Sequence, residues 1–274
     1  MTNHRGRVAV VTGAARGLGQ AVARRLAASG ATVACADVDG VAARKTAEEI
    51  GANGGRAAGF EVDVTSEASL AALREQVHAV LGRVDMVMNV AGILDRRQMA
   101  DTDGEAFRRV IDVNLTGTYL TTRAFAADMT ERGWGRVVNT ASIAGMTGYV
   151  YPSYAASKAG VVNLTRSLLV DFWGTGVTVN AVCPGAMDTE MLDRSAIPAF
   201  IRKTPAGRVV TPQEVAAVFD FLAGEEAACV NGATIVVDGG ATAVFRYADP
   251  EPGYDGRVPH PTSSSTRAGP ARPA

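Results

Sequence analysis

The sequence is poor in cysteine, has no excess charge of one sign and contains no long apolar run. Its three cysteines, Cys35, Cys183 and Cys229, are odd in number and widely spaced, which excludes a disulfide framework and predicts a reducing compartment. Lysine and arginine number 27 against 28 aspartates and glutamates, so the net charge of −1 gives no general attraction to nucleic acid or anionic membranes. The longest apolar run near the N-terminus is Val8 to Val11, far too short for a signal or a span. We therefore predict a soluble, cytoplasmic protein that binds neither nucleic acid nor membrane.

Histidine is equally scarce. His4 lies near the N-terminus, His78 in a helix-compatible stretch and His260 in the C-terminal segment, and we expect all three to be solvated. No cluster of His, Asp and Glu shows the spacing of metal ligands, so no metal site is predicted.

Seven short apolar runs, rich in β-branched residues, alternate with helix-compatible stretches. They are RVAVVTG (7–13), ATVACADV (31–38), GFEVDV (59–64), VDMVMNVAG (84–92), GRVVNTAS (135–142), VTVNAVCPG (177–185) and ATIVVDGG (233–240). Continuous apolar runs are typical of parallel strands covered on both faces. The pattern predicts an α/β fold: a single-domain Rossmann fold whose doubly wound seven-stranded parallel sheet carries helices on both faces. A ligand is then expected beyond the carboxyl ends of the strands.

The 274 residues divide by composition. Residues 1–247 suit one dinucleotide-binding catalytic domain. Residues 248–274 hold six of the eleven prolines, and such a composition buries too little apolar surface to fold alone. We expect this proline-rich extension to be flexible, either solvated or docked on a neighbouring subunit near its active site.

A glycine-rich turn follows the first expected strand and opens an expected helix. Gly13, Gly17 and Gly19, with Arg16 and Leu18 between them, would let the backbone approach a pyrophosphate at the helix N-terminus. The spacing GxxxGxG departs from the dinucleotide fingerprint GxGxxG, so a purely structural turn is the alternative.

Asp37 ends the second expected strand, where a carboxylate can accept the ribose hydroxyls of the adenosine half and repel a 2′-phosphate. Arg16 is the opposing signal, since a basic residue there could reach a 2′-phosphate. The carboxylate decides the interpretation: NAD(H) is the preferred cofactor and NADP(H) the less favoured one. Asp63 and Val64, closing the third expected strand, could hold the adenine.

Further motifs follow in a fixed order along the chain. They are Asn89-Val90-Ala91-Gly92, Asn114, Ser142, Tyr154-Ala155-Ala156-Ser157-Lys158 and Pro184-Gly185. With the glycine turn, they make the chain, from about Gly6 to Gly240, resemble the short-chain dehydrogenase/reductase family. The family often has two adjacent asparagines where this sequence has Asn89-Val90, in a segment whose role is mainly structural.

The chemistry of one pair can be argued from the residues themselves. Tyr154 and Lys158 lie four apart on an expected helix, hence on one face, where an ammonium lowers a phenol pKa from about 10 toward the working range. Tyrosinate would then take the hydroxyl proton in oxidation, and the phenol would protonate the alkoxide in reduction. Ser142 would donate a hydrogen bond to the substrate oxygen. The resemblance assigns Asn114 to a water-linked proton relay with Lys158, and Lys158 also to the nicotinamide ribose; these four are the predicted catalytic residues.

The resemblance also implies where the nicotinamide half would lie. Tyr154 and Lys158 aside, the residues expected beside it are Pro184, Gly185, Met187 and Thr189, while Asn89, Ala91 and Gly92 are expected to bring their backbone near the cofactor. The segment 190–210 that follows would be a mobile substrate lid. An apolar pocket is expected from Met146, Tyr149, Met191, Leu192, Ile197 and Phe200, with Ser142 on the substrate oxygen.

These residues predict an NAD(H)-dependent oxidoreductase that moves a hydride between the cofactor and a small-molecule secondary alcohol or ketone, expected to be hydrophobic, such as an alicyclic or terpenoid compound. The alternative is a 3-ketoacyl (carrier-protein) reductase, which Asp37 and Thr175 oppose, since carrier-docking relatives resemble each other in having arginine at the latter position. A non-catalytic dinucleotide-binding regulatory protein is a minor alternative. The resemblance implies a homotetramer or homodimer, formed through helices near 100–130 and 150–172 and through the C-terminal strand region.

Overall fold

The computed structural model describes residues 2–244 of the chain. A compact unit within this range ends at Thr242. The predicted C-terminal extension at 248–274 lies outside the described residues.

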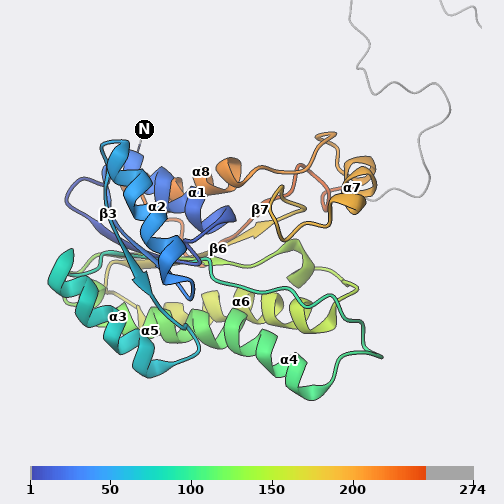
Figure 1. The fold of residues 1–274 in the computed structure, drawn as a ribbon, viewed down its shortest axis with the longest axis horizontal. Helices are drawn as coiled ribbons and strands as arrows, with labels where there is room; N and C mark the ends of the chain where they lie inside the picture. The colour runs from blue at the N-terminus through green and yellow to red at the C-terminus, as the bar shows by residue number, and fades with distance from the viewer. Residues whose placement is uncertain (1, 245–274) are drawn as a thin grey trace, which may run out of the picture. The chain divides into compact units, whose positions relative to one another are not determined.

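A single parallel sheet of seven strands forms the centre of the fold, in the order β3-β2-β1-β4-β5-β6-β7 (Figure 1). The strands are β1 (Val8–Thr12), β2 (Thr32–Asp37), β3 (Arg56–Glu61), β4 (Met86–Asn89), β5 (Gly135–Thr140), β6 (Val177–Pro184) and β7 (Thr234–Val237). The strand order reverses between β1 and β4, which is where open α/β sheets bind ligands. The predicted doubly wound Rossmann fold is confirmed.

Helices cover both faces of this sheet. One face carries α1 (Gly17–Ala28), α2 (Gly40–Ala52) and α8 (Pro212–Leu222), and the other carries α3 (Glu67–Val80), α4 (Gly104–Ile111), α5 (Gly117–Thr130) and α6 (Pro152–Asp171) (Figure 1). A π-helical stretch, η1 (Asp112–Thr116), joins α4 to α5. Short elements complete the described chain: η2 (Ile143–Gly145), η3 (Arg194–Ala196), α7 (Ile197–Lys203) and η4 (Glu225–Ala227).

The apolar strands read as continuous runs because both of their faces are buried. In β1, Ala9 and Val11 pack with the core that includes Phe219 of α8, while Val10 packs with the core that includes Phe125 of α5. Both phenylalanines are fully buried, and each contributes about 2 kcal/mol or more of hydrophobic stabilisation. The sheet thus separates two cores, and only its carboxyl edge is left for chemistry.

The third strand differs from its prediction. It spans Arg56–Glu61 and not 59–64, so Gly59 lies inside the strand. A Cβ at Gly59 would lie 2.3 Å from the Cα of Arg44, so this glycine permits α2 to pack closely and does not mark a turn. Asp63 and Val64 follow the strand and do not close it.

Two of the three histidines are not solvated as predicted. His4 is buried, and its Nε2 lies 2.9 Å from Oδ1 of Asp220. His78 places its Nε2 2.6 Å from Oδ2 of the fully buried Asp128. Buried carboxylates need partners, and these imidazoles supply them. His260 lies outside the described residues.

No helix within residues 2–244 combines the length and apolarity that crossing a membrane requires.

Candidate active site

The glycine turn between β1 and α1 gives its three glycines different roles. A Cβ at Gly19 would lie 2.0 Å from the carbonyl oxygen of Gly13, and a Cβ at Gly13 would lie 2.9 Å from the backbone of Ala91. Gly17 has a φ of +56°, which disfavours other residues, and only Thr189 lies within 4 Å of its added Cβ. Gly13 and Gly19 therefore allow close backbone packing, while Gly17 shapes an open turn.

The start of α1 is available to an anion. Arg16 is the N-cap residue, its side chain makes no capping hydrogen bond, and the first turn contains no acidic residue. Helix N-termini leave N–H groups without intrahelical partners and carry a partial positive charge. Arg16 itself is exposed and pairs with Glu190 at 3.2 Å. This geometry fits a pyrophosphate, with Leu18 and Gly19 buried beneath the turn.

Asp37 lies at the end of β2 and contacts the same turn. Its Oδ2 accepts a hydrogen bond from the N–H of Ala15 at 3.0 Å, and its Oδ1 accepts one from the N–H of Asp39 at 3.0 Å. The carboxylate is half-buried. Asp37 therefore both stabilises the glycine turn and presents negative charge beside it.

Thr12 joins the turn to the end of β4, and it was not among the site residues predicted from the sequence. Its Oγ1 accepts hydrogen bonds from the N–H groups of Val90 at 3.1 Å and Ala91 at 3.2 Å. These bonds hold the segment that leads to Gly92 beside β1. A hydroxyl at the end of the first strand, one residue before the glycines, is the signal that could have identified it.

The side chain of Asn89 does not face the carboxyl edge as a ligand contact. It is buried, and its Nδ2 donates to Thr122 Oγ1 at 2.9 Å and to Asn139 Oδ1 at 2.8 Å. Asn139 in turn donates to Thr165 Oγ1 at 3.0 Å. This buried chain ties β4 and β5 to α5 and α6, and it leaves Oδ1 of Asn89 buried without a partner within the described residues.

Asn114 lies in the π-helical stretch η1 and is fully buried. Its Oδ1 accepts from the N–H of Ile93 at 2.8 Å, and its Nδ2 donates to the carbonyl of Ile93 at 3.0 Å and to Ser157 Oγ at 3.0 Å. A Cβ at Gly92 would lie 3.2 Å from Asn114 Oδ1 and 3.5 Å from Lys158 Nζ. Gly92 thus leaves space at a point that Asn114 and Lys158 both border. π-Helical turns are frequent at functional sites because they redirect a side chain.

Tyr154 and Lys158 both lie on α6, as predicted, and Ser142 lies beside them. Lys158 is buried, and its Nζ lies 5.8 Å from the centre of the Tyr154 ring and donates to the carbonyl of Thr140 at 2.7 Å. Ser142 follows β5 by two residues. The N–H of Ala144 donates to Ser142 Oγ at 3.1 Å. The structure therefore brings the four predicted catalytic residues to one end of the sheet.

Burial and neighbouring groups shift the pKa values of Tyr154 and Lys158, and the sequence spacing did not predict these shifts. Burial raises the pKa of Tyr154 to about 12, although the hydrogen bond with Ser142 lowers it. Burial lowers the pKa of Lys158 to about 8. The predicted lowering of the tyrosine pKa by the lysine is wrong for these groups, because the amine bonds Thr140 and desolvation of the phenol dominates.

The segment after β6 crosses above the glycine turn. A Cβ at Gly185 would lie 2.8 Å from Cβ of Asp238, so this glycine lets the chain pass close to the end of β7. Met187 pairs with Val210 in an isolated parallel bridge. Thr189 is the side chain that borders Gly17. Thr189 therefore comes from the far half of the sheet to the glycine turn.

Of the expected substrate residues, Tyr149 lies beside Tyr154. The Tyr149 ring lies 6.3 Å from the Tyr154 ring, centre to centre. Met146 and Met191 are exposed, and η3 and α7, which include Ile197 and Phe200, contain no buried residue. Leu192 is half-buried. The expected apolar residues other than Tyr149 are therefore only loosely packed.

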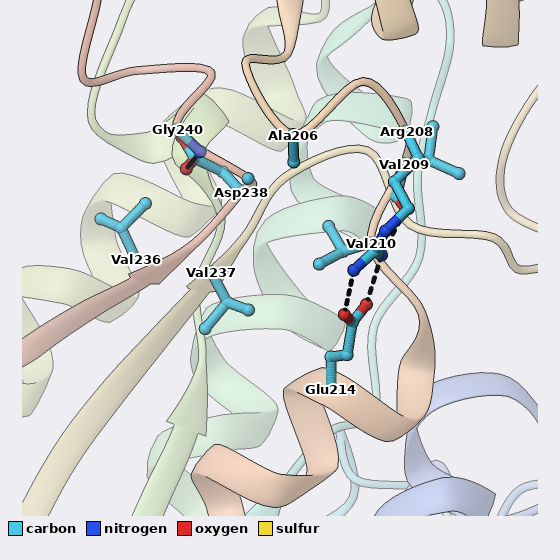
Figure 2. Close-up of a pocket in the computed structure, with 10 residues that line it drawn as sticks. Ala206, Arg208, Val209, Val210, Glu214, Val236, Val237, Asp238 and Gly240 are labelled. Atoms are coloured by element: carbon cyan, nitrogen blue, oxygen red, sulfur yellow. Dashed lines mark hydrogen bonds and ion pairs between the residues drawn. The ribbon is translucent and has the colours of Figure 1, made fainter. Parts of the chain in front are cut away.

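The pocket in Figure 2 is separate from the predicted site residues. It has a volume of about 310 Å³ and is formed by β7, residues 206–210 and the start of α8. Arg208 binds both carboxylate oxygens of Glu214 at its rim, at 2.9 and 2.5 Å (Figure 2). Its described lining includes none of the predicted catalytic, cofactor or substrate residues. Among residues 2–244, no group of three or more His, Cys, Asp or Glu side chains could hold a metal ion.

Known proteins match this chain over most of its length. A family model described as enoyl-(acyl carrier protein) reductase matches residues 13–242. The structure of a short-chain type dehydrogenase/reductase from Mycobacterium marinum superimposes with a TM-score of 0.85 at 33% identity, covering 88% of this chain and 98% of that one. The chain belongs to the short-chain dehydrogenase/reductase family. It is therefore an oxidoreductase of the class that acts on alcohols or ketones with NAD(P)H.

Curated relatives in the short-chain dehydrogenase/reductase family differ in substrate. The cis-4-hydroxycyclohexanecarboxylate dehydrogenase of Sinomonas cyclohexanicum is 43% identical over 245 residues, covering 87% of this chain and 97% of that protein. The 3-oxoacyl-[acyl-carrier-protein] reductase FabG of Pseudomonas aeruginosa is 39% identical over 239 residues, covering 86% and 97%. Both the predicted activity and its alternative are thus represented among the relatives.

Proposed function

We propose that this chain is an NAD(H)-dependent dehydrogenase of a hydrophobic, alicyclic type of secondary alcohol, with Tyr154 as the general acid–base. The observation that carries the proposal is the cluster at the end of β5 and the start of α6. There the amine of Lys158 lies 5.8 Å from the centre of the Tyr154 ring, and Ser142 lowers the pKa of Tyr154 against the larger, opposite effect of burial.

The chemistry assigned to these side chains balances. When bound, nicotinamide would accept a hydride from the carbinol carbon in oxidation and return it in reduction. Tyr154 takes the hydroxyl proton as the C–H bond breaks, and returns it to the oxygen in the reverse direction. Ser142 donates a hydrogen bond that stabilises charge on the same oxygen.

We propose that Asn114 acts by positioning its neighbours. Its amide fixes Ile93 and Ser157, and Ser157 Oγ in turn donates to the carbonyl of Tyr154 at 2.8 Å. Lys158 borders the same space at Gly92. Lys158, with a pKa near 8, is protonated at neutral pH, so it would first release its own proton toward this space and then take the one that comes from the side of Tyr154.

The preference for NAD(H) rests on the charge beside the glycine turn. The Asp37 carboxylate is fixed by Ala15 and Asp39, and a 2′-phosphate beside it would meet like charge. Arg16 supports the same preference, because its guanidinium is paired with Glu190. The contacts proposed for the rest of the cofactor are those of the turn, of residues 89–92 and of residues 184–189, with Asp63 and Val64 toward the adenine.

The alicyclic substrate class is supported by the Tyr149 ring, 6.3 Å from the Tyr154 ring, and by the 43% identical cis-4-hydroxycyclohexanecarboxylate dehydrogenase. The second candidate, a 3-oxoacyl carrier-protein reductase, is favoured by the 39% identical relative. Against it, Thr175 bonds only its own turn, donating to the carbonyl of Phe172 at 2.7 Å and accepting from Val177. Comparing a carrier-bound with a free ketone separates the two candidates.

Tyr154→Phe tests the catalytic assignment. The purified protein is assayed with NAD⁺ and NADP⁺ against a panel of alicyclic and open-chain secondary alcohols. Loss of the phenol proton carrier should lower kcat by about 10³-fold, while NADH affinity changes less than about threefold. Tyr151→Phe is the matched control, because Tyr151 is the N-cap of α6 and its ring packs on Tyr149. A Tyr154→Phe enzyme with wild-type turnover would refute the assignment.

An oligomer is part of the same proposal. Phe107 on α4, Tyr119 on α5 and Val170 on α6 are exposed apolar side chains on the helices expected to form one interface. Burying such side chains favours self-association. A homotetramer or homodimer should appear in sedimentation analysis, and a monomer at micromolar concentration would contradict it.

A further inference from the structure

Arg96 lies in the loop between β4 and α4 and reaches across to the lid segment. Its Nη2 donates a hydrogen bond to the carbonyl of Met191 at 2.6 Å. The next residue behaves differently: Arg97 binds both carboxylate oxygens of Asp95, at 3.0 and 2.6 Å. Both arginines are exposed. One is thus satisfied within its own loop, and the other projects toward the site.

Tyr149 links Arg96 to the reacting end of the site. The Tyr149 ring lies 6.3 Å from the Tyr154 ring. Burial and the neighbouring Tyr151 raise the pKa of Tyr149, and the charge of Arg96 acts in the opposite direction. The charge of Arg96 thus acts on the tyrosine whose ring neighbours that of Tyr154.

This cation has no carboxylate of its own. Of the arginines along the lid, Arg194 lies 3.7 Å from Asp188 and Arg16 lies 3.2 Å from Glu190. Within residues 2–244, no carboxylate lies within 4 Å of the Arg96 guanidinium. Its neighbour in charge is Asp193, whose pKa it lowers weakly, but Oδ1 of Asp193 already accepts from the N–H and Oγ of Ser195.

We propose that Arg96 is a specificity-determining residue that binds an anionic substituent, a carboxylate, on the far side of the alcohol substrate. The guanidinium has five N–H donors in a planar fork that matches a carboxylate, and the carbonyl of Met191 occupies only part of them. The substrate class is then a hydrophobic hydroxy acid whose hydroxyl meets Tyr154 while its carboxylate meets Arg96. This inference rests on the proposed function, since it places the substrate by Tyr154.

A binding experiment tests the carboxylate site without turnover. Cyclohexanecarboxylate and cyclohexanecarboxamide have the same ring, lack a reactive hydroxyl and differ in charge. Titration calorimetry on the protein saturated with NADH should show the carboxylate bound about 10-fold or more tightly than the amide, as expected for a charge-assisted pair. Arg96→Gln should remove that preference, and Arg96→Lys should keep part of it because the charge remains.

Arg97→Gln is the matched control, since it removes a neighbouring positive charge that Asp95 already pairs. NADH affinity checks that each variant is folded. The proposal is overturned if the wild type binds the two probes equally or binds neither, if Arg96→Gln keeps the preference, or if Arg97→Gln loses it equally.

Turnover separates this inference from the proposed function. For cis-4-hydroxycyclohexanecarboxylate against cyclohexanol, the ratio of kcat/KM values should fall about 10-fold in Arg96→Gln. Oxidation of neutral alcohols with no carboxylate preference would leave the proposed function standing and defeat the inference. A carboxylate preference that depends on Arg96, without oxidation of any alcohol in the panel, would support the inference and defeat the proposed substrate class.

Discussion

Replacing Lys158 by methionine should make the protein more stable at neutral pH while it loses activity. Lys158 is 3% exposed, and burial lowers its pKa from 10.5 to about 8. At pH 7 the folded protein must therefore carry a charge in a poorly solvated place. Methionine has a similar length, no charge and a flexible thioether that fills irregular space.

The magnitude follows from proton linkage. A tenfold change in proton affinity corresponds to about 1.4 kcal/mol, so the lowered pKa of Lys158 costs about 3 kcal/mol of stability at pH 7. Methionine removes that cost but also removes the hydrogen bond to Thr140, which contributes about 1 kcal/mol. We expect Lys158→Met to be more stable by about 2 kcal/mol at pH 7, or about 4–8 °C in Tm.

The advantage should disappear as the pH rises. Between pH 8 and 10.5 the unfolded wild-type chain binds more protons at this lysine than the folded chain does, so wild-type stability increases with pH relative to the variant. Near pH 10 the variant has lost the hydrogen bond and gains little from the missing charge. The difference in Tm should therefore shrink toward zero.

Calorimetric Tm values of both proteins at pH 7 and pH 10, at one protein concentration, measure this difference. Lys45→Met is the control, because Lys45 lies exposed on α2 and its replacement should change Tm equally at both pH values. If the Tm values of wild type and Lys158→Met run parallel with pH, or if the variant is the less stable at pH 7, burial of a charged Lys158 is not the cost calculated here.

Two further variants test the packing and the buried carboxylates. Gly19→Ala would place a Cβ 2.0 Å from the carbonyl of Gly13 and should lower Tm by roughly 6–12 °C and abolish NADH binding, whereas Gly51→Ala on α2, with nothing within 4 Å of its added Cβ, should raise Tm slightly. Equal Tm values for these two variants would contradict the assigned close approach. Asp220→Asn should lower the free energy of unfolding by about 2–3 kcal/mol at pH 7. Burial raises the pKa of Asp220, but its hydrogen bonds, the first from His4, outweigh burial and hold that pKa below its usual range. Such stability is present above the unfolded pKa of about 4 and is lost as the pH falls, so the deficit should shrink in Tm measurements below pH 4; a deficit unchanged by acid would show that shape and not charge is responsible.

The chain's periodicity determined the fold class. Apolar runs of four to eight residues, alternating with helices, admit few arrangements other than a covered parallel sheet, and the glycine turn and the Tyr154-Lys158 spacing are local enough to be found in a linear sequence. The limits of β3 could not be predicted in this way. The expected strand was placed at 59–64, and only the approach of Arg44 from α2 to Gly59 explains why a glycine lies inside the strand.

What only the tertiary structure decided depends on contacts between distant segments. The burial that sets the pKa of Tyr154 and Lys158, the closure of Asn89 into a polar chain with Asn139, and the pairing of His4 with Asp220 join residues far apart in sequence. Arg96 belongs to no sequence motif. Its proposed role depends on the hydrogen bond to the carbonyl of Met191, 95 positions later in the chain. A sequence thus records which groups are present and how the chain repeats, because hydrophobic periodicity is local. Desolvation and charge pairing are set by neighbours that the fold alone brings together.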